Sequence, residues 1–308
     1  MHLTNRKVFE GKMIITRLKI RFEHRKERLK VMKKRVISFV LTLALALAML
    51  PAGAFAADEG DLTTNDNPKS QWSADKTSYY DANGEKVTGA KKIGSKVWYF
   101  NKSGIKRTKR GFFKAGGNEY YAKKDGSLAT GFKAIKSGEK LKGYYFYKKG
   151  DKIAQMAKGT KIKYLKIPKS GRLNEAYALG IKVLDKKGWK LRNAFKYARN
   201  TRYDYKSMRR KSISSYAKFG FKNRTGNCYC KAAQFFVMAK LLGYNVHMYS
   251  GKVGSETHSW TTIKHDDGTW MYDPVVLNSS SAWNHSFWYK FKKGQKGTWR
   301  YSKAKRMD

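Results

Sequence analysis

The second half of the chain alternates between segments of helical and of strand periodicity. Three stretches carry apolar residues every three or four positions, which predicts amphipathic helices. They span residues 172–187, 190–200 and 212–219. A fourth apolar helix begins near Cys228 and continues to Leu242, where Gly243 follows as an expected C-cap. Strand-like runs come next, at residues 245–250, 258–264 and 269–276. Helices followed by such strands predict an α+β fold for this half.

Residues 78–160 repeat a pattern of paired aromatic residues. The pairs recur at intervals of roughly 20 residues, and a glycine follows each of them. They are Tyr79-Tyr80, Trp98-Tyr99, Tyr120-Tyr121 and Tyr144-Tyr145. An aromatic strand, a glycine turn and a second short strand predict one β-hairpin per unit. Because a lone hairpin is only marginally stable, we expect the units to stack into a solenoid and to bury aromatic rings against their neighbours.

The N-terminal residues have the pattern of an export signal. Positive charges after Met32 precede an apolar segment, and Ala54-Phe55-Ala56 offers an Ala-x-Ala cleavage site. An uncleaved membrane anchor is the alternative, since the apolar stretch just reaches spanning length. We therefore expect an over-extended start at 1–31, a signal peptide at 32–56, a flexible linker at 57–77, the repeats at 78–160 and a separate domain at 165–308.

The charge balance indicates an anionic environment. The 308 residues contain 67 Lys and Arg against 22 Asp and Glu, a net charge of +45. Such an excess is typical of proteins that meet anionic wall polymers, membrane surfaces, acidic substrates or nucleic acid. Because the chain is expected to be secreted and associated with a Gram-positive type of wall, we expect no nucleic-acid partner, and a membrane contact only if the signal segment stays uncleaved.

The two cysteines of the chain, Cys228 and Cys230, are candidates for chemistry. Exported proteins usually use cysteines as disulfides, but side chains two positions apart on a helix diverge, so this pair cannot form one. Cys228 lies at a helix start capped by Thr225 or Asn227, where the helix dipole favours a thiolate. Cys230 is expected to be structural, and two inert buried thiols are the alternative. With no second cysteine pair, neither a metal site nor a cofactor is expected.

Three motifs follow one another in the order cysteine, histidine, aspartate. They are G-x-C-x-x-x-A around Cys228, H-x-W at His258 and W-x-x-D-P around Asp273. Together they resemble the transglutaminase-like core of the papain-like cysteine enzymes, over roughly residues 172–276. The resemblance implies that Cys228 is the nucleophile, that His258 is the general base and acid, and that Asp273 orients the imidazole.

The spacing of His258 and Asp273 can be tested against hairpin geometry. If the turn at 265–268 is a four-residue loop, Lys264 pairs with Thr269 and Asp273 becomes the diagonal neighbour of His258 on one face of the sheet. Diagonal neighbours lie about 7–8 Å apart at the backbone, within reach of two polar side chains. A loop of odd length would instead place the two residues on opposite faces.

The aromatic repeats resemble cell-wall-binding repeats of the choline-binding and glucan-binding type. In the choline-binding members, aromatic residues of successive units surround a quaternary ammonium through cation–π contacts. Phe112 and Phe132 stand where that family has tryptophan, and the many interspersed lysines favour an anionic glycopolymer or peptidoglycan instead. The candidate ligand-binding residues are Trp98, Tyr99, Tyr120, Tyr121, Phe132, Tyr144 and Tyr145. The alternative is that these rings form only the core of the solenoid.

These features predict an exported, wall-associated cysteine enzyme that transfers acyl groups from peptide or glutamine amides of a peptide or protein substrate. Hydrolysis is favoured over crosslinking. The backbone N–H of Cys228 is the expected oxyanion donor, and the sequence identifies no second one. Two alternatives stay open: a wall-binding or adhesive protein with an inactive transglutaminase-like domain, and a surface protein whose thiol forms adducts with partners.

Overall fold

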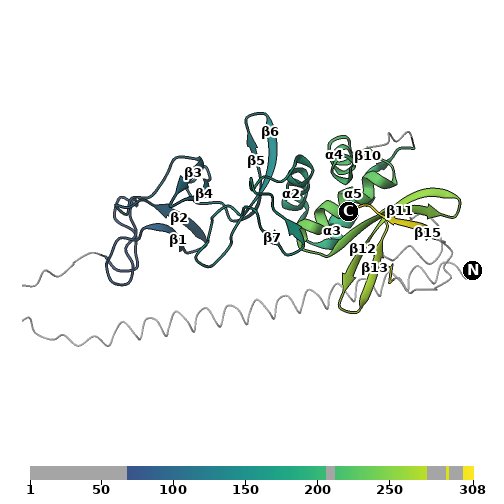
Figure 1. The fold of residues 1–308 in the computed structure, drawn as a ribbon. Coiled ribbons are helices and arrows are strands. Elements are labelled where there is room, and N and C mark those ends of the chain that lie inside the picture. Colours follow the sequence, from purple (N-terminus) through teal and green to yellow (C-terminus); the bar gives the residue numbers. More distant parts are fainter. Residues whose placement is uncertain (1–67, 206–211, 276–288, 291–300) are drawn as a thin grey trace, which may run out of the picture. The chain divides into compact units, whose positions relative to one another are not determined.

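The computed structural model describes residues 68–205, 212–275, 289–290 and 301–308. The described residues all belong to one unit of the chain, Asn65–Asp308 (Figure 1). The expected over-extended start at 1–31 and signal peptide at 32–56 lie outside them. Within the described ranges, no helix has the length and apolar character needed to cross a membrane.

The fold is α+β, with β-hairpins first and then four helices and an antiparallel sheet. The first strands are β1 (Gly89–Ile93), β2 (Lys96–Phe100), β3 (Gly111–Ala115), β4 (Asn118–Ala122), β5 (Gly131–Ser137), β6 (Lys140–Phe146), β7 (Lys161–Ile162) and β8 (Leu165–Lys166). The helices are α2 (Glu175–Lys187), α3 (Leu191–Arg199), α4 (Ile213–Asn223) and α5 (Cys228–Leu242). The later strands are β9 (Arg202–Tyr203), β10 (Thr225–Gly226), β11 (Val246–Val253), β12 (Glu256–His265), β13 (Gly268–Tyr272), β14 (Tyr289–Lys290) and β15 (Tyr301–Arg306).

The repeats form three hairpins, β1–β2, β3–β4 and β5–β6, each closed by a two-residue turn. Gly116 and Gly117 close the second turn with φ values of +54° and +75°. Both lie in the left-handed region that the favoured hairpin turns require and that glycine adopts without steric cost. The aromatic pairs therefore lie on the second strand of each hairpin, and not on the first as the sequence pattern predicted.

The glycine that follows each aromatic pair belongs to a longer connecting loop. After β2, the side-chain oxygen of Asn101 accepts hydrogen bonds from the backbone N–H groups of Ser103 and Ile105, at 3.0 and 2.8 Å. Only one isolated bridge, between Phe100 and Lys106, forms beyond this loop. The aromatic pairs lie on the second strand because a two-residue turn places the strands on either side of it directly in register, whereas the longer loop after each pair does not.

The first aromatic pair belongs to a unit without a regular hairpin. Tyr79 pairs with Trp72 and Tyr80 with Lys86 through isolated bridges. The backbone N–H of Ser70 also donates a hydrogen bond to the carbonyl of Asp81 at 2.8 Å. The described end of the segment predicted as a flexible linker, 57–77, thus forms part of the first repeat unit.

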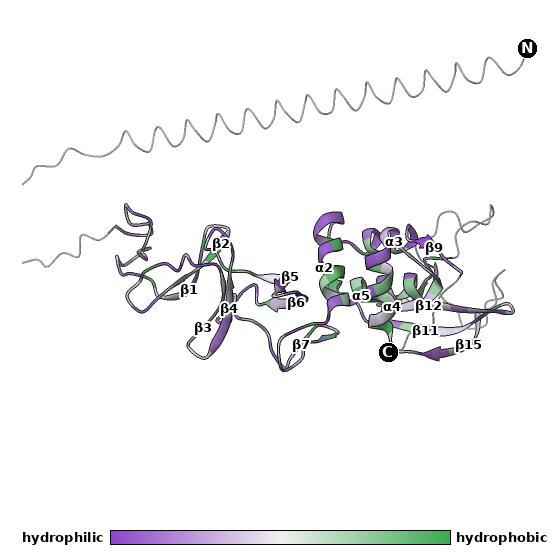
Figure 2. Ribbon diagram, turned by 90° about the horizontal axis from the view of Figure 1, so that it is seen from above, coloured by the Kyte–Doolittle hydropathy of each residue, from purple (hydrophilic) through white to green (hydrophobic). Residues whose placement is uncertain are grey.

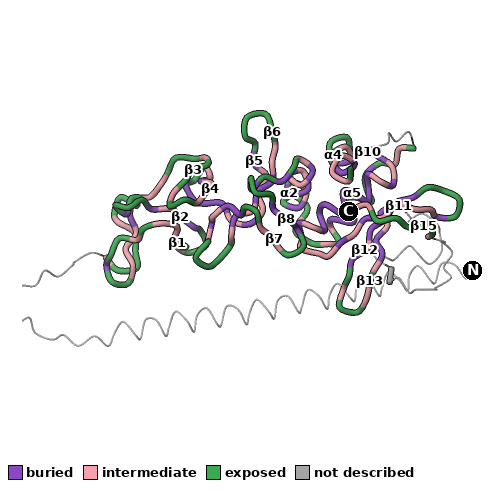
Figure 3. Tube along the Cα trace, in the orientation of Figure 1, coloured by how far each residue is buried: buried purple, intermediate pink, exposed green. Residues whose placement is uncertain are grey.

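Helices α2, α3 and α5 begin and end close to the predicted positions, and α4 continues four residues beyond its predicted end at 219. Asn174 caps α2, Ser212 and Ser215 form a capping box on α4, and Gly243 ends α5 with φ +87°. Helix α5 packs against α2, α3 and α4 and against strands β11 and β12. Its residues are accordingly buried on nearly all sides (Figure 3), and the helix is largely apolar (Figure 2).

The sheet contains five strands in the order β14–β13–β12–β11–β15, and every pairing is antiparallel. Lys264 pairs with Thr269 and His265 with Gly268, so the predicted four-residue turn is confirmed. The edge strands, β14 and β15, both come from residues after 276. The C-terminal part of the chain therefore pairs with the central strands, which carry the candidate site.

Candidate active site

Cys228 is the first residue of α5, and a tight turn positions it there. The parallel pairing of β10 with β9 places Gly226 beside Tyr203, and the side chain of Asn227 accepts a hydrogen bond from the backbone N–H of Cys230 at 3.2 Å. A Cβ on Gly226 would come within 2.5 Å of the Cβ of Cys230, so only glycine fits this approach. The sulfur of Cys228 is thereby held where the helix dipole is positive.

His258 and Asp273 meet across the β12–β13 hairpin as their spacing predicted. The Nε2 atom of His258 lies 2.6 Å from Oδ2 of Asp273, and their side chains are 9% and 6% exposed. The backbone N–H of Val275 donates to Oδ1 of Asp273 at 2.9 Å. This last bond holds the carboxylate at the end of the strand, where Pro274 keeps the preceding residue extended.

Cys228 lies within hydrogen-bonding reach of His258, so the structure brings all three predicted residues together. Burial lowers the pKa of His258, but hydrogen bonds with Asp273 and Cys228 and their negative charges outweigh it and raise this pKa from 6.5 to about 10. Because Nε2 is bonded to Asp273, the bond with Cys228 uses Nδ1. The arrangement favours a charged imidazole that faces sulfur on one side and a carboxylate on the other.

Aromatic side chains fix the imidazole and the carboxylate in place. Trp260 stacks on His258 with ring centroids 6.4 Å apart, and Tyr301 packs edge-on against Trp260 at 4.9 Å. The hydroxyl of Tyr301 donates to Oδ2 of Asp273 at 2.8 Å. Burial, and then the charge of Asp273, raises the pKa of Tyr301, so this donor keeps its proton.

Tyr203 is a second residue at the site that the sequence analysis missed. Its hydroxyl lies close enough to Cys228 for both the side chain and the backbone N–H of that cysteine to act on its pKa. Burial, and then the nearby Cys228, raises the pKa of Tyr203 to about 12, so the hydroxyl remains a donor. Neither Tyr203 nor Tyr301 belongs to a spaced motif. Tyr203 lies on β9, which pairs with β10 just before Cys228, and Tyr301 lies on β15, which pairs with β11, the neighbour of the strand that carries His258.

Cys230 occupies a different environment from Cys228. It is 2% exposed and packs in the main hydrophobic cluster. Neither cysteine forms a disulfide. Within the described ranges, no group of three or more His, Cys, Asp and Glu side chains is arranged to hold a metal ion.

The candidate ligand residues of the repeats divide into buried and half-buried rings. Tyr120 and Tyr144 are 5% and 2% exposed and form part of the packing between units. The half-buried rings are Trp98, Tyr99, Tyr121, Phe132 and Tyr145. Phe132 stacks on Trp189 at 5.9 Å, so this ring contacts the connection between α2 and α3.

One pair of tryptophans already surrounds a cation of the chain itself. The Nζ atom of Lys106 lies 4.8 Å from the ring centre of Trp72 and 5.2 Å from that of Trp98. Tyr79 packs edge-on against Trp72 at 5.4 Å. This cluster therefore has the composition of an ammonium-binding cage, with a lysine as its occupant.

No family model matches this chain, and no curated protein matches its sequence. Solved structures are similar to parts of it. Choline binding protein F from Streptococcus pneumoniae is 24% identical and covers 33% of this chain and 33% of its own, at a TM-score of 0.24. A structure described as a TGase is 13% identical and covers 35% of this chain and 33% of its own, at a TM-score of 0.29. This chain thus spans about a third of the length of each.

Proposed function

We propose that this chain is an exported, wall-associated cysteine enzyme that transfers acyl groups from peptide or glutamine amides. The observation that carries the proposal is the 2.6 Å hydrogen bond between His258 and Asp273 beside a cysteine at a helix start. A charged imidazole in this position stabilises a thiolate, which is the form of cysteine that attacks carbonyl carbon.

The reaction proceeds in two halves. The thiolate of Cys228 attacks the amide carbonyl, and the imidazolium of His258 gives its proton to the departing amine or ammonia, which leaves a thioester. His258 then takes a proton from water or from an acceptor amine as that molecule attacks the thioester carbonyl. The thiolate departs, and the product is a carboxylic acid or a new amide. Asp273 keeps the imidazole in the orientation that both halves need.

Two donors are placed to stabilise the oxyanion of each tetrahedral intermediate. The backbone N–H of Cys228 and the hydroxyl of Tyr203 lie next to each other beside the Cys228 side chain. We expect the substrate carbonyl oxygen to enter between the N–H of Cys228 and the hydroxyl of Tyr203 and to accept a hydrogen bond from each. Preorganised donors of this kind are among the largest contributions to acyl transfer.

Replacing Tyr203 with phenylalanine is expected to lower kcat on the order of 10²-fold with little change in KM, because one oxyanion donor is lost. Tyr205→Phe is the matched control, since Tyr205 is 90% exposed and its ring packs on Tyr203 at 4.8 Å. Steady-state kinetics of both variants give the comparison. A higher rate in Tyr203→Phe would mean that the hydroxyl blocks the thiol and does not assist it.

The acceptor distinguishes hydrolysis from crosslinking, and mass spectrometry of the products decides between them. The mature chain is incubated with wall-derived peptides, with and without a primary amine. Hydrolysis, which we favour, yields cleaved or deamidated peptides in both arms, whereas transamidation yields an amine adduct in the second. If no product depends on Cys228, the chain is a wall-binding protein with an inactive domain.

We propose further that the repeats hold the chain at the wall through anionic polymers. The supporting observation is that Lys106 fills the cage of Trp72 and Trp98, so this cluster presents a positive charge and not an empty ammonium site. Glu119 and Asp125 are each paired with a lysine, at 3.1 and 2.9 Å, which leaves the excess of positive charge on the repeats uncompensated.

Removing the occupant should convert the cage into a site for an external ammonium. Lys106→Ala is expected to bind choline with a Kd on the order of 1 mM, because the two indole faces become accessible to a cation. Quenching of tryptophan fluorescence measures this binding. Lys102→Ala, in an exposed loop position, is the matched control. Equal choline binding by the unsubstituted chain would contradict the assignment of Lys106.

A further inference from the structure

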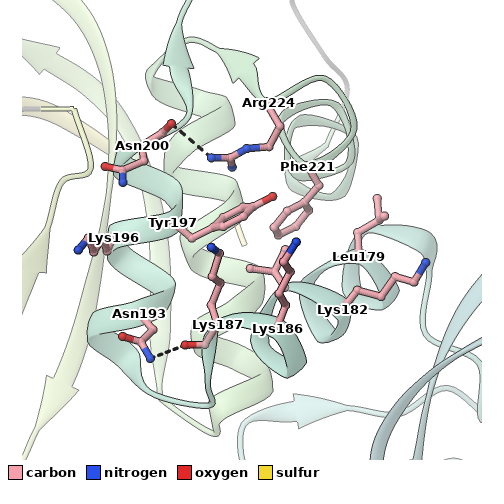
Figure 4. Close-up of a pocket in the computed structure, with 11 residues that line it drawn as sticks. Leu179, Lys182, Lys186, Lys187, Asn193, Lys196, Tyr197, Asn200, Phe221 and Arg224 are labelled. Atoms are coloured by element: carbon pink, nitrogen blue, oxygen red, sulfur yellow. Dashed lines mark hydrogen bonds between the residues drawn. The ribbon is translucent and has the colours of Figure 1, made fainter.

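A cleft on the helical part of the chain carries positive charge without a matching carboxylate. It has a volume of about 670 Å³ and lies between α2, α3 and the C-terminal end of α4. Five of its eleven lining residues are cationic and none is acidic. The cations are Lys182, Lys186, Lys187, Lys196 and Arg224. Figure 4 shows these side chains around the cleft, with Lys186 and Lys187 extending toward the rings of Tyr197 and Phe221.

The carboxylates of the surrounding helices are engaged elsewhere. Helices α2, α3 and α4 contain two acidic residues, Glu175 and Asp185. Glu175 is bound at 2.7 Å by both Lys218 and Lys222, and Asp185 accepts a hydrogen bond from Trp189 at 2.9 Å. Neither carboxylate lines the cleft, so no acidic side chain lies among its cations.

One cation of the cleft is held rigidly on an aromatic floor. The guanidinium carbon of Arg224 lies 3.9 Å from the ring centre of Tyr197, and its nitrogens donate to Thr201 Oγ1 at 3.1 Å and to the carbonyl of Asn200 at 3.3 Å. These bonds use two of its five N–H groups. The rings of Tyr197 and Phe221 lie 6.0 Å apart. A fixed guanidinium beside two rings can bind an anionic group and a sugar face together.

We infer that this cleft binds an anionic glycopolymer, whose phosphate or carboxylate groups repeat along a chain of sugars or polyols. A single small anion would need donors that converge on one point, whereas these cations come from three segments and surround a cleft large enough for several units of a polymer. The choice of a wall polymer over nucleic acid rests on the proposed function, because it depends on export.

The position of Arg224 relates this cleft to the candidate active site. Arg224 immediately precedes β10, and its carbonyl accepts a hydrogen bond from the backbone N–H of Arg202 at 3.0 Å. The residues that follow these two, Thr225 and Tyr203, lead directly to Cys228 or contact it. A polymer in the cleft would thus be bound by the same part of the fold that carries the cysteine, independently of the repeats.

The test compares two double variants with the same loss of charge in the full mature chain. Lys186→Gln with Lys187→Gln removes two cations of the cleft, and Lys264→Gln with Lys305→Gln removes two exposed lysines outside it. Binding of poly(ribitol phosphate) and of polygalacturonate is measured by calorimetry, with dextran as the neutral polymer. The first double variant is expected to bind at least one of the two anionic polymers about tenfold more weakly, a difference of about 1.4 kcal/mol, and the second less than twofold.

The two polymers separate phosphate from carboxylate as the anionic group. Equal losses in both double variants would overturn the proposal, because binding would then reflect net charge alone. The proposal would also be overturned by a single-stranded oligonucleotide that binds more tightly than either polymer and loses that affinity in the double variant of Lys186 and Lys187. The same measurements in a Cys228→Ala background are expected to be unchanged, so the outcome is separate from that of the enzymatic proposal.

Discussion

Cys228→Ala will abolish turnover of any substrate that the chain processes. Among the described cysteines only Cys228 lies beside His258, whereas Cys230 packs in the hydrophobic core. Loss of a nucleophile that acts with its base typically removes the full effect of the catalytic group, on the order of 10⁶-fold. Product formation followed by mass spectrometry, with thermal melting to confirm folding, measures the result.

Cys230→Ser is the matched control for this experiment. It replaces the other thiol, two positions away on α5, and should leave the rate nearly unchanged, whereas Cys228→Ser should lose activity as Cys228→Ala does. A hydroxyl in place of the thiol inside this hydrophobic cluster would lower the stability by about 1–3 kcal/mol, because a polar group is then buried among apolar side chains, and the melting curve detects this loss. If Cys230→Ser removes activity while Cys228→Ser retains it, the nucleophile has been assigned to the wrong cysteine.

His258→Ala and Asp273→Ala have the next largest expected effects. The first should be nearly as severe as loss of the cysteine, because the general base and the partner of the thiolate disappear together. Asp273→Ala keeps the imidazole but removes its 2.6 Å hydrogen bond, so a loss of about 10²–10⁴-fold in kcat is expected. The double variant should be no worse than His258→Ala, since both residues act through one imidazole.

The kinetic constants of each variant, measured with a substrate of the unsubstituted chain, test this order. Tyr301→Phe provides a graded comparison, because it removes one hydrogen bond to Asp273 of 2.8 Å and leaves the carboxylate in place. Its effect should be smaller than that of Asp273→Ala. An Asp273→Ala variant within threefold of the normal rate would contradict a catalytic role for this carboxylate.

The local geometry of the site was predictable from the sequence because it depends on short spacings. The pairing of Lys264 with Thr269 follows from a four-residue turn, and with it the side of the sheet on which His258 and Asp273 lie. The start of α5 at Cys228 follows from its apolar period and from Gly243 at its end. Each of these features is fixed by residues within one hairpin or one helix.

The contacts that the sequence analysis missed join residues from separate segments. Tyr301 reaches Asp273 because β15 pairs with β11, and Tyr203 reaches Cys228 because β9 pairs with β10. Periodicity within a segment carries no information about which distant strand will lie beside it. Lys106 between Trp72 and Trp98 is a case of the same kind, since the loop that positions it belongs to one unit and the rings belong to two.

The strand of each hairpin that carries the aromatic pair is set by the position of the two-residue turn. The paired aromatics marked a strand correctly, but they did not say which of its neighbours pairs with it. Gly116-Gly117 is one of the residue pairs that two-residue hairpin turns prefer, and the corresponding positions close β1–β2 and β5–β6. Because each of these turns precedes an aromatic pair, turn length predicts that the pairs lie on the second strand of each hairpin.

The most direct test of the central claim, that Cys228, His258 and Asp273 act as one unit, is the titration of His258 followed by NMR of a histidine-labelled chain. The imidazole is expected to stay protonated through neutral pH and to lose its proton near pH 10, because hydrogen bonds with Asp273 and Cys228, and then their negative charges, outweigh burial and raise its pKa from 6.5 to about 10. In Cys228→Ala and in Asp273→Asn this pKa should fall, since burial then acts against fewer opposing charges. A normal titration near pH 6.5 in the unsubstituted chain, or a titration that Cys228→Ala leaves unchanged, would contradict the account.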